Sequence, residues 1–342
     1  MAKRVTFLIP IRSADQLHAE ALRSVTKQSQ SECDVVVLGI GAGVEPPELL
    51  RQFKDVNYLS VPAGTRTSEA MNRGLMMCEG PLVAMVEPGI VLAPDWLDVL
   101  LDAIAVDLHV YAACGKVVEP GDSGKIEAVG EGVDELGRRY PIGAGDDERL
   151  TWKLAREVFG PHPAAVLLRR KLFSMIGPFD GAYGAGAEFA DLALRFRWLG
   201  LKAIYLPGAR AMRIEGTKPK PAAPLAQESD RLRLFFKCFP HGMLWVNAPR
   251  VLLKLLGVAL FRGMLFLFQF LRALPGLLAR RREVHSQAAV YPQYMFAWLR
   301  AEPTRNPLFT VYRSAVEAVI GPQGPAPIAS LPAPPTDDAG WN

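Results

Sequence analysis

The sequence predicts an α/β fold, built on a doubly wound and mostly parallel sheet and followed by a C-terminal helical region. Two observations support this prediction. Short apolar runs alternate with amphipathic segments along the N-terminal part of the chain, and this spacing is typical of strand–helix units. The chain has 342 residues and is 50% hydrophobic, so it can bury one large α/β domain and still have material left over.

Four apolar runs near the N-terminus have the length and composition of buried parallel strands. They cover residues 5–9, 34–38, 56–61 and 81–86. Pro10 ends the first run, because proline cannot donate a hydrogen bond to a neighbouring strand. Amphipathic helices are expected between the strands, over residues 14–28, 46–54 and 67–77.

The loops after these strands are expected to form a ligand site, because ligands of doubly wound sheets bind outside the carboxyl ends of the strands. Gly39 and Gly41 follow the second strand in a glycine-rich turn, whose backbone N–H groups can approach a diphosphate. A plain flexible loop is an equal alternative for this turn. Glu87 follows the fourth strand, and Asp95 is expected to cap a helix over residues 96–107.

The middle of the chain continues the alternation and contains the segment around which the site is organised, residues 164–216. A strand is expected over residues 110–118 and a further β segment over residues 126–134. The central segment then reads as a strand over 165–168, a helix over 170–176, a glycine-rich loop, a helix over 188–199 ended by Gly200, and a strand over 203–206.

Two carboxylates enter this segment directly after the glycine-rich loop. Glu188 lies in the first helical turn, where free backbone N–H groups and the helix dipole favour a negative charge, and Asp191 lies one turn further on the same side. The two acids either take part in chemistry or merely complement the helix dipole. If they are functional, Gly39, Glu87, Glu188 and Asp191 should converge at one cleft.

Several motifs resemble, in order and spacing, those of the GT-A domain of family-2 glycosyltransferases, particularly the rhamnosyltransferase-like members. They are the strand that ends in Ile9-Pro10, the helix from Leu22 to Gln28, Ala70-Met-Asn72-Arg-Gly74, Gly177-Pro-Phe-Asp180, and the helix that contains Glu188, Asp191 and Arg195. The resemblance implies a GT-A fold, a nucleotide sugar as donor, and a glycan or lipid-linked glycan as acceptor.

The resemblance also implies roles for individual residues. Glu188 is the candidate general base, with Asp191 as its support. Glu87 is the candidate ligand of a Mg²⁺ or Mn²⁺ ion, and with Arg213 it would handle the diphosphate. The candidate substrate- and nucleotide-binding residues are Pro10, Gly39, Gly41, Asn72, Gly74 and Arg213.

Four positions depart from the family pattern. The acid that holds the nucleotide base is missing from residues 38–43, and Gly89 stands where the second metal-binding acid is expected. Phe189 replaces the Asp of the family's Glu-Asp pair, and Arg213 stands near the place of a family His. A guanidinium can neutralise a diphosphate without a metal. The alternative for this arginine is a solvated side chain or a pair with Glu215.

Two functional hypotheses follow from these matches and departures. The first is an enzyme that transfers a sugar with inversion, in the synthesis of a cell-surface polysaccharide. The second is a catalytically inactive GT-A module that binds a glycan or a partner glycosyltransferase. The first is favoured, because a transfer site can be rearranged to work without a metal.

The C-terminal part differs in composition from the predicted domain of residues 1–217. A proline-rich linker covers residues 218–224, and a basic and apolar helical region covers residues 225–320. Residues 225–300 hold eleven Lys or Arg against three acids. The proline-rich tail, residues 321–342, is expected to be disordered.

Residues 249–272 form the most apolar run, and the sequence predicts a single helix there. A polar stripe crosses it, formed by Arg250, Lys254, Arg262, Gln269 and Arg272. We expect this helix to lie in a membrane interface, where the run from Arg280 to Arg282 adds attraction to anionic lipid. A helix packed against the protein or a second copy, and a membrane span, are the alternatives.

The sequence also bears on location and partners. Cys33, Cys78, Cys114 and Cys238 are far apart and form no Cys-x-x-Cys pair, so neither a zinc site nor a disulfide framework is expected. No secretory signal is apparent at the N-terminus. We therefore expect a cytoplasmic protein, peripheral to the inner face of the plasma membrane, whose partners are the membrane surface and a partner glycosyltransferase or a second copy, without nucleic acid.

Overall fold

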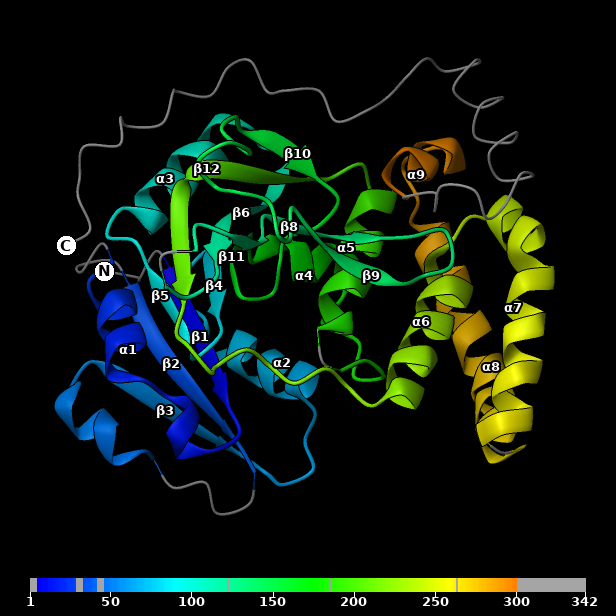
Figure 1. The fold of residues 1–342 in the computed structure, drawn as a ribbon, viewed down its shortest axis with the longest axis horizontal. Helices are drawn as coiled ribbons and strands as arrows, with labels where there is room; N and C mark the ends of the chain where they lie inside the picture. The colour runs from blue at the N-terminus through cyan, green and yellow to red at the C-terminus, as the bar shows by residue number, and fades with distance from the viewer. Residues whose placement is uncertain are drawn as a thin grey trace.

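The computed structural model describes residues 5–28, 33–41, 46–121, 123–184, 186–262 and 264–299. The predicted disordered tail and the end of the helical region lie outside these residues. The fold is a mixed α/β domain with helices on both faces of a large sheet, joined to a group of C-terminal helices (Figure 1).

The N-terminal half of the sheet is parallel, as predicted. Its strands lie in the order β4-β1-β2-β3. Their bounds are Val5–Ile11 (β1), Cys33–Ile40 (β2), Val56–Val61 (β3) and Leu82–Val86 (β4). The chain leaves β1 towards β2 on one side and returns to β4 on the other, so the gap between the carboxyl ends of β1 and β4 is the switch point where ligands bind in such sheets.

The other half of the sheet is mixed. The sheet continues from β4 through β11 (Ala165–Arg169) and β6 (Val110–Val118) to β12 (Lys202–Arg213) and β10 (Arg156–Val158), while β5 (Ile90–Leu92) pairs with β12. The pair β6–β12 is parallel, but β11 runs antiparallel to both of its neighbours. The apolar runs indicated β6, β11 and the first part of β12, but they did not indicate β5 or β10 and carried no information on the direction of β11.

Three helices of the domain cover the sheet. They are α1 (Ala19–Thr26), α2 (Thr67–Met77) and α3 (Trp96–Val106). The predicted helix over 14–28 is broken into the 3₁₀ turn η1 (Ala14–Gln16) and α1, because the Gln16 side chain accepts a hydrogen bond from the Arg12 backbone N–H at 2.6 Å and holds a turn. A second 3₁₀ turn, η2 (Glu48–Gln52), replaces the helix expected over 46–54. Asp95 stands at the N-cap of α3 without a side-chain capping bond.

The β segment predicted over residues 126–134 consists of two short strands, β7 (Ile126–Ala128) and β8 (Gly130–Val133). β7 pairs with β6 at the main sheet, whereas β8 forms an antiparallel hairpin with β9 (Arg139–Ile142). In Figure 1 this hairpin extends from the domain towards α6. The hairpin therefore connects the sheet to the C-terminal helices.

The C-terminal helices are α6 (Pro224–Cys238), α7 (His241–Arg262), α8 (Met264–Ser286) and α9 (Pro292–Trp298). The single helix predicted over 249–272 is wrong, since α7 ends at Arg262 and α8 begins at Met264. The sequence has a glycine between them, the least favourable residue in a helix after proline. No described helix combines the length and apolar character needed to cross a membrane.

The C-terminal helices share the core of the domain. Trp198 of the domain donates through Nε1 to the backbone carbonyl of Cys238 in α6 at 2.7 Å. Phe236 of α6 packs on Phe270 of α8, with 5.6 Å between the ring centroids. The predicted linker at residues 218–224 therefore joins two parts that are packed on one another.

α7 turns part of the predicted polar stripe towards the protein. Arg250 donates to Glu135 Oε1 at 2.9 Å, and Lys254 Nζ lies 3.9 Å from Glu228 Oε2. Large apolar side chains are exposed instead, and we call them the α7–α8 apolar surface. Its members are Trp245, Leu252, Leu253, Leu256, Leu260, Met264, Leu265, Phe268 and Leu271.

Candidate active site

Glu188 lies at the start of α5 (Ala187–Trp198), on the far side of the glycine-rich loop that follows α4 (Lys171–Ile176). Its side chain is buried, with 3% exposure, and Oε2 accepts a hydrogen bond from the backbone N–H of Gly186 at 3.0 Å. Gly186 has a φ of +90°, a conformation that favours glycine. Burial raises the pKa of Glu188, while the positive charges of Arg139 and Arg12 act in the opposite direction.

Arg139, from β9, is the cation closest to the start of α5. Its Nη1 donates to Glu131 Oε1 of β8 at 2.7 Å. A Cβ atom added to Gly186 would lie 2.7 Å from the same Nη1, so Arg139 packs directly against this glycine. Burial raises the pKa of Glu131 to about 7, against the lowering effect of Arg139. The second oxygen of Glu131, Oε2, is buried and has no hydrogen-bond partner among the described residues.

Arg12 brings the switch point of the sheet into this group. It follows directly after β1, and its Nη2 donates to Thr67 Oγ1 at the start of α2 at 2.9 Å. Its charge lowers the pKa of Glu188, which places Arg12 within electrostatic range of that carboxylate. Glu188 is therefore a buried carboxylate within electrostatic range of two arginines, one of which follows β1 directly.

A second charge cluster lies after β4. Arg213, at the end of β12 and 2% exposed, donates to both oxygens of Glu127 at 2.6 and 2.9 Å and to Glu87 Oε2 at 2.8 Å. The pair with Glu215 considered from the sequence is absent from the contacts of Arg213, and Glu215 is exposed. The remaining nitrogen, Nη1, is buried and has no partner among the described residues.

These residues do not fit a divalent metal site. Such an ion needs several oxygen ligands, and the two nearest carboxylates, Glu87 and Glu127, are already bound to Arg213. A Cβ atom on Gly89 would lie 2.3 Å from Thr217 Oγ1, so the expected second acid has no room. In the part of the chain that the structure describes, no three His, Cys, Asp or Glu side chains are grouped to hold a metal.

His162 interacts electrostatically with members of both clusters. Burial lowers its pKa to about 4, and Glu127, Arg213 and Arg139 are within electrostatic range of its imidazole. The imidazole is therefore neutral near pH 7.

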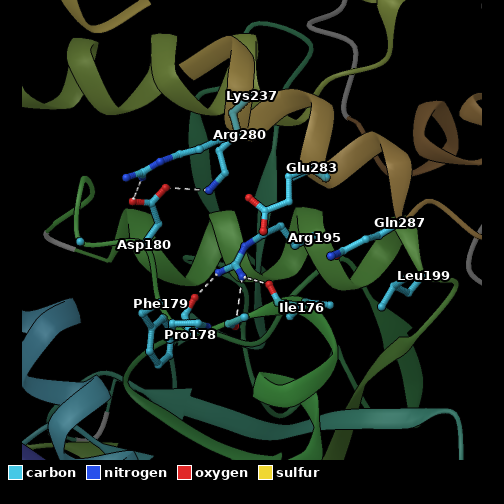
Figure 2. Close-up of a pocket in the computed structure, with 13 residues that line it drawn as sticks. Ile176, Pro178, Phe179, Asp180, Arg195, Leu199, Lys237, Arg280, Glu283 and Gln287 are labelled. Carbon is cyan, nitrogen blue, oxygen red and sulfur yellow. Dashed lines mark hydrogen bonds and ion pairs between the residues drawn. The ribbon is translucent and has the colours of Figure 1, made fainter. Parts of the chain in front are cut away.

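Asp191 does not support Glu188. Its side chain is fully buried, accepts from Arg195 Nε at 2.8 Å, and accepts from Lys237 Nζ of α6 at 2.6 Å. Lys237 also binds Asp180 at 2.8 Å, and Arg280 of α8 binds the same aspartate. Figure 2 shows Asp180, Lys237 and Arg280 meeting beside a cavity of about 270 Å³. Asp191 therefore joins α5 to α6.

Asn72 and Gly74 of α2 have structural partners. The Asn72 amide donates to the carbonyl of Phe179 at 2.9 Å and accepts from the Phe179 N–H at 2.9 Å. It thus holds the glycine-rich loop before Glu188. A Cβ atom on Gly74 would lie 3.1 Å from side-chain atoms of Leu8 and Leu38, so this glycine permits close packing of α2 on the sheet.

The predicted residues of β1 and β2 also lie within the fold. Pro10 is in register with Leu38 in the parallel pair β1–β2. A Cβ atom on Gly39 would meet the Tyr58 hydroxyl at 1.8 Å, and the backbone N–H of Gly41 donates to the carbonyl of Val61 at 3.0 Å. The structure explains both glycines by contacts with β3. The four residues expected to converge are therefore divided: Glu188 and Glu87 lie in two linked clusters, Gly39 lies in the sheet, and Asp191 faces α6.

Several members of the site were not predicted from the sequence. They are polar or charged side chains outside the motifs that carry the family resemblance: Arg12, Glu127, Glu131, Arg139 and His162. Charged residues inside the short apolar strands of residues 126–142 were the available signal, since buried charges need partners.

Comparisons with known proteins agree with this architecture. The family model described as glycosyl transferase family 2 matches residues 6–177. No curated protein sequence matches the chain. A structure of GalNAc-T7 with UDP, GalNAc and Mn²⁺ is similar in fold, with a TM-score of 0.60 and 14% identity over 86% of this chain and 56% of that chain. The chain thus spans little more than half of that protein.

Two further solved structures are similar at lower scores. One is TarS residues 1–349 of S. aureus, with a TM-score of 0.46 and 14% identity over 68% of this chain and 64% of that chain. The other is the mannosyltransferase PcManGT from Pyrobaculum calidifontis in complex with GDP-Man and Mn²⁺, with a TM-score of 0.45 and 16% identity over 94% of this chain and 86% of that chain.

Proposed function

The chain belongs to glycosyl transferase family 2, and from this premise we propose that it transfers a sugar from a nucleotide sugar to a glycan or lipid-linked acceptor with inversion. The observation that carries the proposal is the position of Glu188. It is a buried carboxylate held by the Gly186 N–H, within electrostatic range of Arg139 and of Arg12, the residue that follows β1. A position of this kind and a raised pKa suit a general base.

The proposed step transfers one proton and replaces one carbon–oxygen bond by another. The acceptor hydroxyl gives its proton to Glu188, and its oxygen forms a bond to the anomeric carbon of the donor sugar. The bond from that carbon to the diphosphate oxygen breaks in line, and its electron pair leaves with the nucleoside diphosphate. The product has the opposite anomeric configuration.

Arginines are the proposed partners of the diphosphate. Arg213 keeps a buried Nη1 that has no partner among the described residues, and Arg12 lies at the switch point. A guanidinium pairs with phosphate oxygens through two parallel hydrogen bonds and keeps its charge at any working pH. The leaving group would then be stabilised by fixed cations of the chain.

A specific observation favours a second candidate, an inactive module that binds a glycan or a partner glycosyltransferase. Arg213 already neutralises Glu87 and Glu127, and Phe189 stands where the family has its catalytic Asp. A site with these changes can keep the fold and lose the donor.

Donor binding separates the two candidates. We expect at least one member of a panel of UDP-, GDP- and dTDP-sugars to bind the full-length protein, as measured by isothermal titration calorimetry. The dissociation constant should be similar with Mn²⁺ and with EDTA, because Arg213 is already bound to Glu87, the candidate metal ligand. If no donor binds under either condition, the inactive module is the function; if only Mn²⁺ permits binding, the assignment of Arg213 is wrong.

We further propose that the protein works at the cytoplasmic face of the plasma membrane, in the synthesis of a cell-envelope polysaccharide. The α7–α8 apolar surface supports this, because exposed apolar areas of this extent usually contact a membrane or a partner. The run from Arg280 to Arg282 offers less positive charge to a lipid surface than expected. Successive helical residues point in different directions, and two of these arginines face the protein: Arg280 binds Asp180, and Arg281 donates to the carbonyl of Phe236.

Vesicle sedimentation tests this attachment. We expect full-length protein to sediment with anionic phosphatidylglycerol vesicles, and a Leu253→Asp/Leu260→Asp variant to remain largely in the supernatant, because both leucines are exposed on α7. The control is Glu48→Lys, which changes charge at an exposed residue of η2 far along the chain. Equal sedimentation of the two variants would contradict a membrane role for this surface. If the full-length protein is instead a dimer that the leucine variant disrupts, the surface is the contact between two copies.

A further inference from the structure

We propose that the cavity between the β8–β9 turn and α6 binds a neutral sugar unit of the acceptor, with Asp230 accepting a hydrogen bond from one of its hydroxyls. This inference rests on the proposed function and names the place of its second substrate. The cavity, the side chains around it and its connection to Glu188 each contribute to the argument.

The cavity has a volume of about 300 Å³, near the lower limit of about 300 Å³ for small-molecule sites. One wall is the hairpin turn with Arg138 and Arg139. The other is the N-terminal part of α6 with Gln227, Asp230 and Arg231. Because α6 lies outside the residues 6–177 that the family model matches, this wall is supplied by the chain's own C-terminal part.

Arg139 connects the cavity to the candidate base. The same guanidinium lines the cavity, binds Glu131 at 2.7 Å and lies against Gly186, whose N–H holds Glu188. Asp230 interacts electrostatically with both Arg139 and Glu188. A sugar in the cavity would therefore lie beside the residues that position Glu188.

The charges of the cavity favour a neutral ligand. Three arginines line the cavity, Arg138, Arg139 and Arg231, together with two acids, Glu228 and Asp230. Arg231 is bound to Glu228 through Nε at 2.8 Å, and Arg139 is bound to Glu131 outside the lining, so the three cations face three acids. The cavity offers carboxylates that accept hydrogen bonds and guanidinium and amide groups that donate them. Sugar hydroxyls can both donate and accept, so they match this lining.

Asp230 is positioned to select such a ligand. Burial raises its pKa to about 6, while Arg139 and Arg233 act in the opposite direction. At neutral pH it is therefore mostly ionised and can accept two hydrogen bonds or more. A hydrogen bond to a charged group that is lost without replacement costs about ten- to a hundredfold in binding.

Saturation-transfer NMR on the full-length protein tests the site. The probes are the methyl glycosides of rhamnose, mannose, glucose, galactose and N-acetylglucosamine, with methyl glucuronide as the anionic probe. At least one neutral glycoside should bind, and Asp230→Asn should weaken that binding about tenfold or more. Asp102→Asn, an exposed residue of α3, is the matched control and should have no effect. Nucleotide-sugar affinity should be unchanged in both variants.

The outcomes separate this inference from the proposed function. Binding of a neutral glycoside that Asp230→Asn weakens supports the cavity as an acceptor site, even if no nucleotide sugar binds and the enzyme assignment fails. Absence of glycoside binding, preferential binding of methyl glucuronide, or an Asp230→Asn variant with unchanged affinity overturns the inference. Gln227→Ala, at the solvent-exposed rim, is the second variant if Asp230→Asn does not fold, and unchanged affinity there has the same meaning.

Discussion

Glu188→Gln is expected to lower the turnover of sugar transfer by about two to four orders of magnitude, the usual contribution of a general base. The amide keeps the size of the side chain and can still accept the hydrogen bond from Gly186, so the fold should be retained. Nucleotide-sugar binding should change little, because the acid acts on the acceptor. Turnover and the dissociation constant of the donor are the two measurements.

The role of Glu188 as a base also predicts how the rate of transfer changes with pH. A base works in its deprotonated form, and burial raises the pKa of Glu188. The rate should therefore fall as the pH drops through a value above the ordinary range of a glutamate, which is about 4.3. Glu215→Gln makes the same charge change at an exposed residue and should leave the profile unaltered. Full turnover in Glu188→Gln would move the proton acceptor to another acid of the cluster.

The N-terminal sheet could be predicted because its signals are local. The apolar run over residues 110–118 has the bounds of β6, and the runs of β1 to β4 were found within a few residues. Strand direction is not a local property, so the antiparallel entry of β11 was missed. The break between α7 and α8 was missed because the apolar pattern continues through it.

The candidate site was only partly predictable for the same reason. Glu188 was found because a carboxylate after a glycine-rich loop is a short-range pattern. Its electrostatic partner, Arg139, belongs to a hairpin and lies 49 positions earlier in the sequence. The role of Arg213 also depends on Glu127, which lies 86 positions earlier in the chain and to which the sequence pattern assigned no role. Pairs of this kind appear only when the chain is folded.

Asp191→Ala is expected to lower the free energy of unfolding by about 3–5 kcal/mol, because removing one partner of a buried ion pair leaves the other charge uncompensated. Asp191 is fully buried and holds Lys237 at 2.6 Å and Arg195 at 2.8 Å. Burial alone would lower the pKa of Lys237, but Asp191, together with Cys238 and Asp180, outweighs that effect and raises it. Urea unfolding measures the change, and Asp102→Ala, on the exposed side of α3, should stay within about 0.5 kcal/mol of the original chain.

A double-mutant cycle assigns this loss to the pair between α5 and α6. Asp191→Ala combined with Lys237→Met should lose less stability than the sum of the two single variants, because no lysine charge is then left buried beside the missing carboxylate. The remaining partner of Lys237, Asp180, keeps its contact with Arg280 in the double variant. Strict additivity would contradict direct coupling. The conservative Asp191→Asn variant distinguishes a structural role from a role in catalysis. A loss of turnover without a loss of stability would mean that Asp191 supports Glu188. A parallel loss of turnover and stability would mean that Asp191 acts through the contact that fixes α6 to α5.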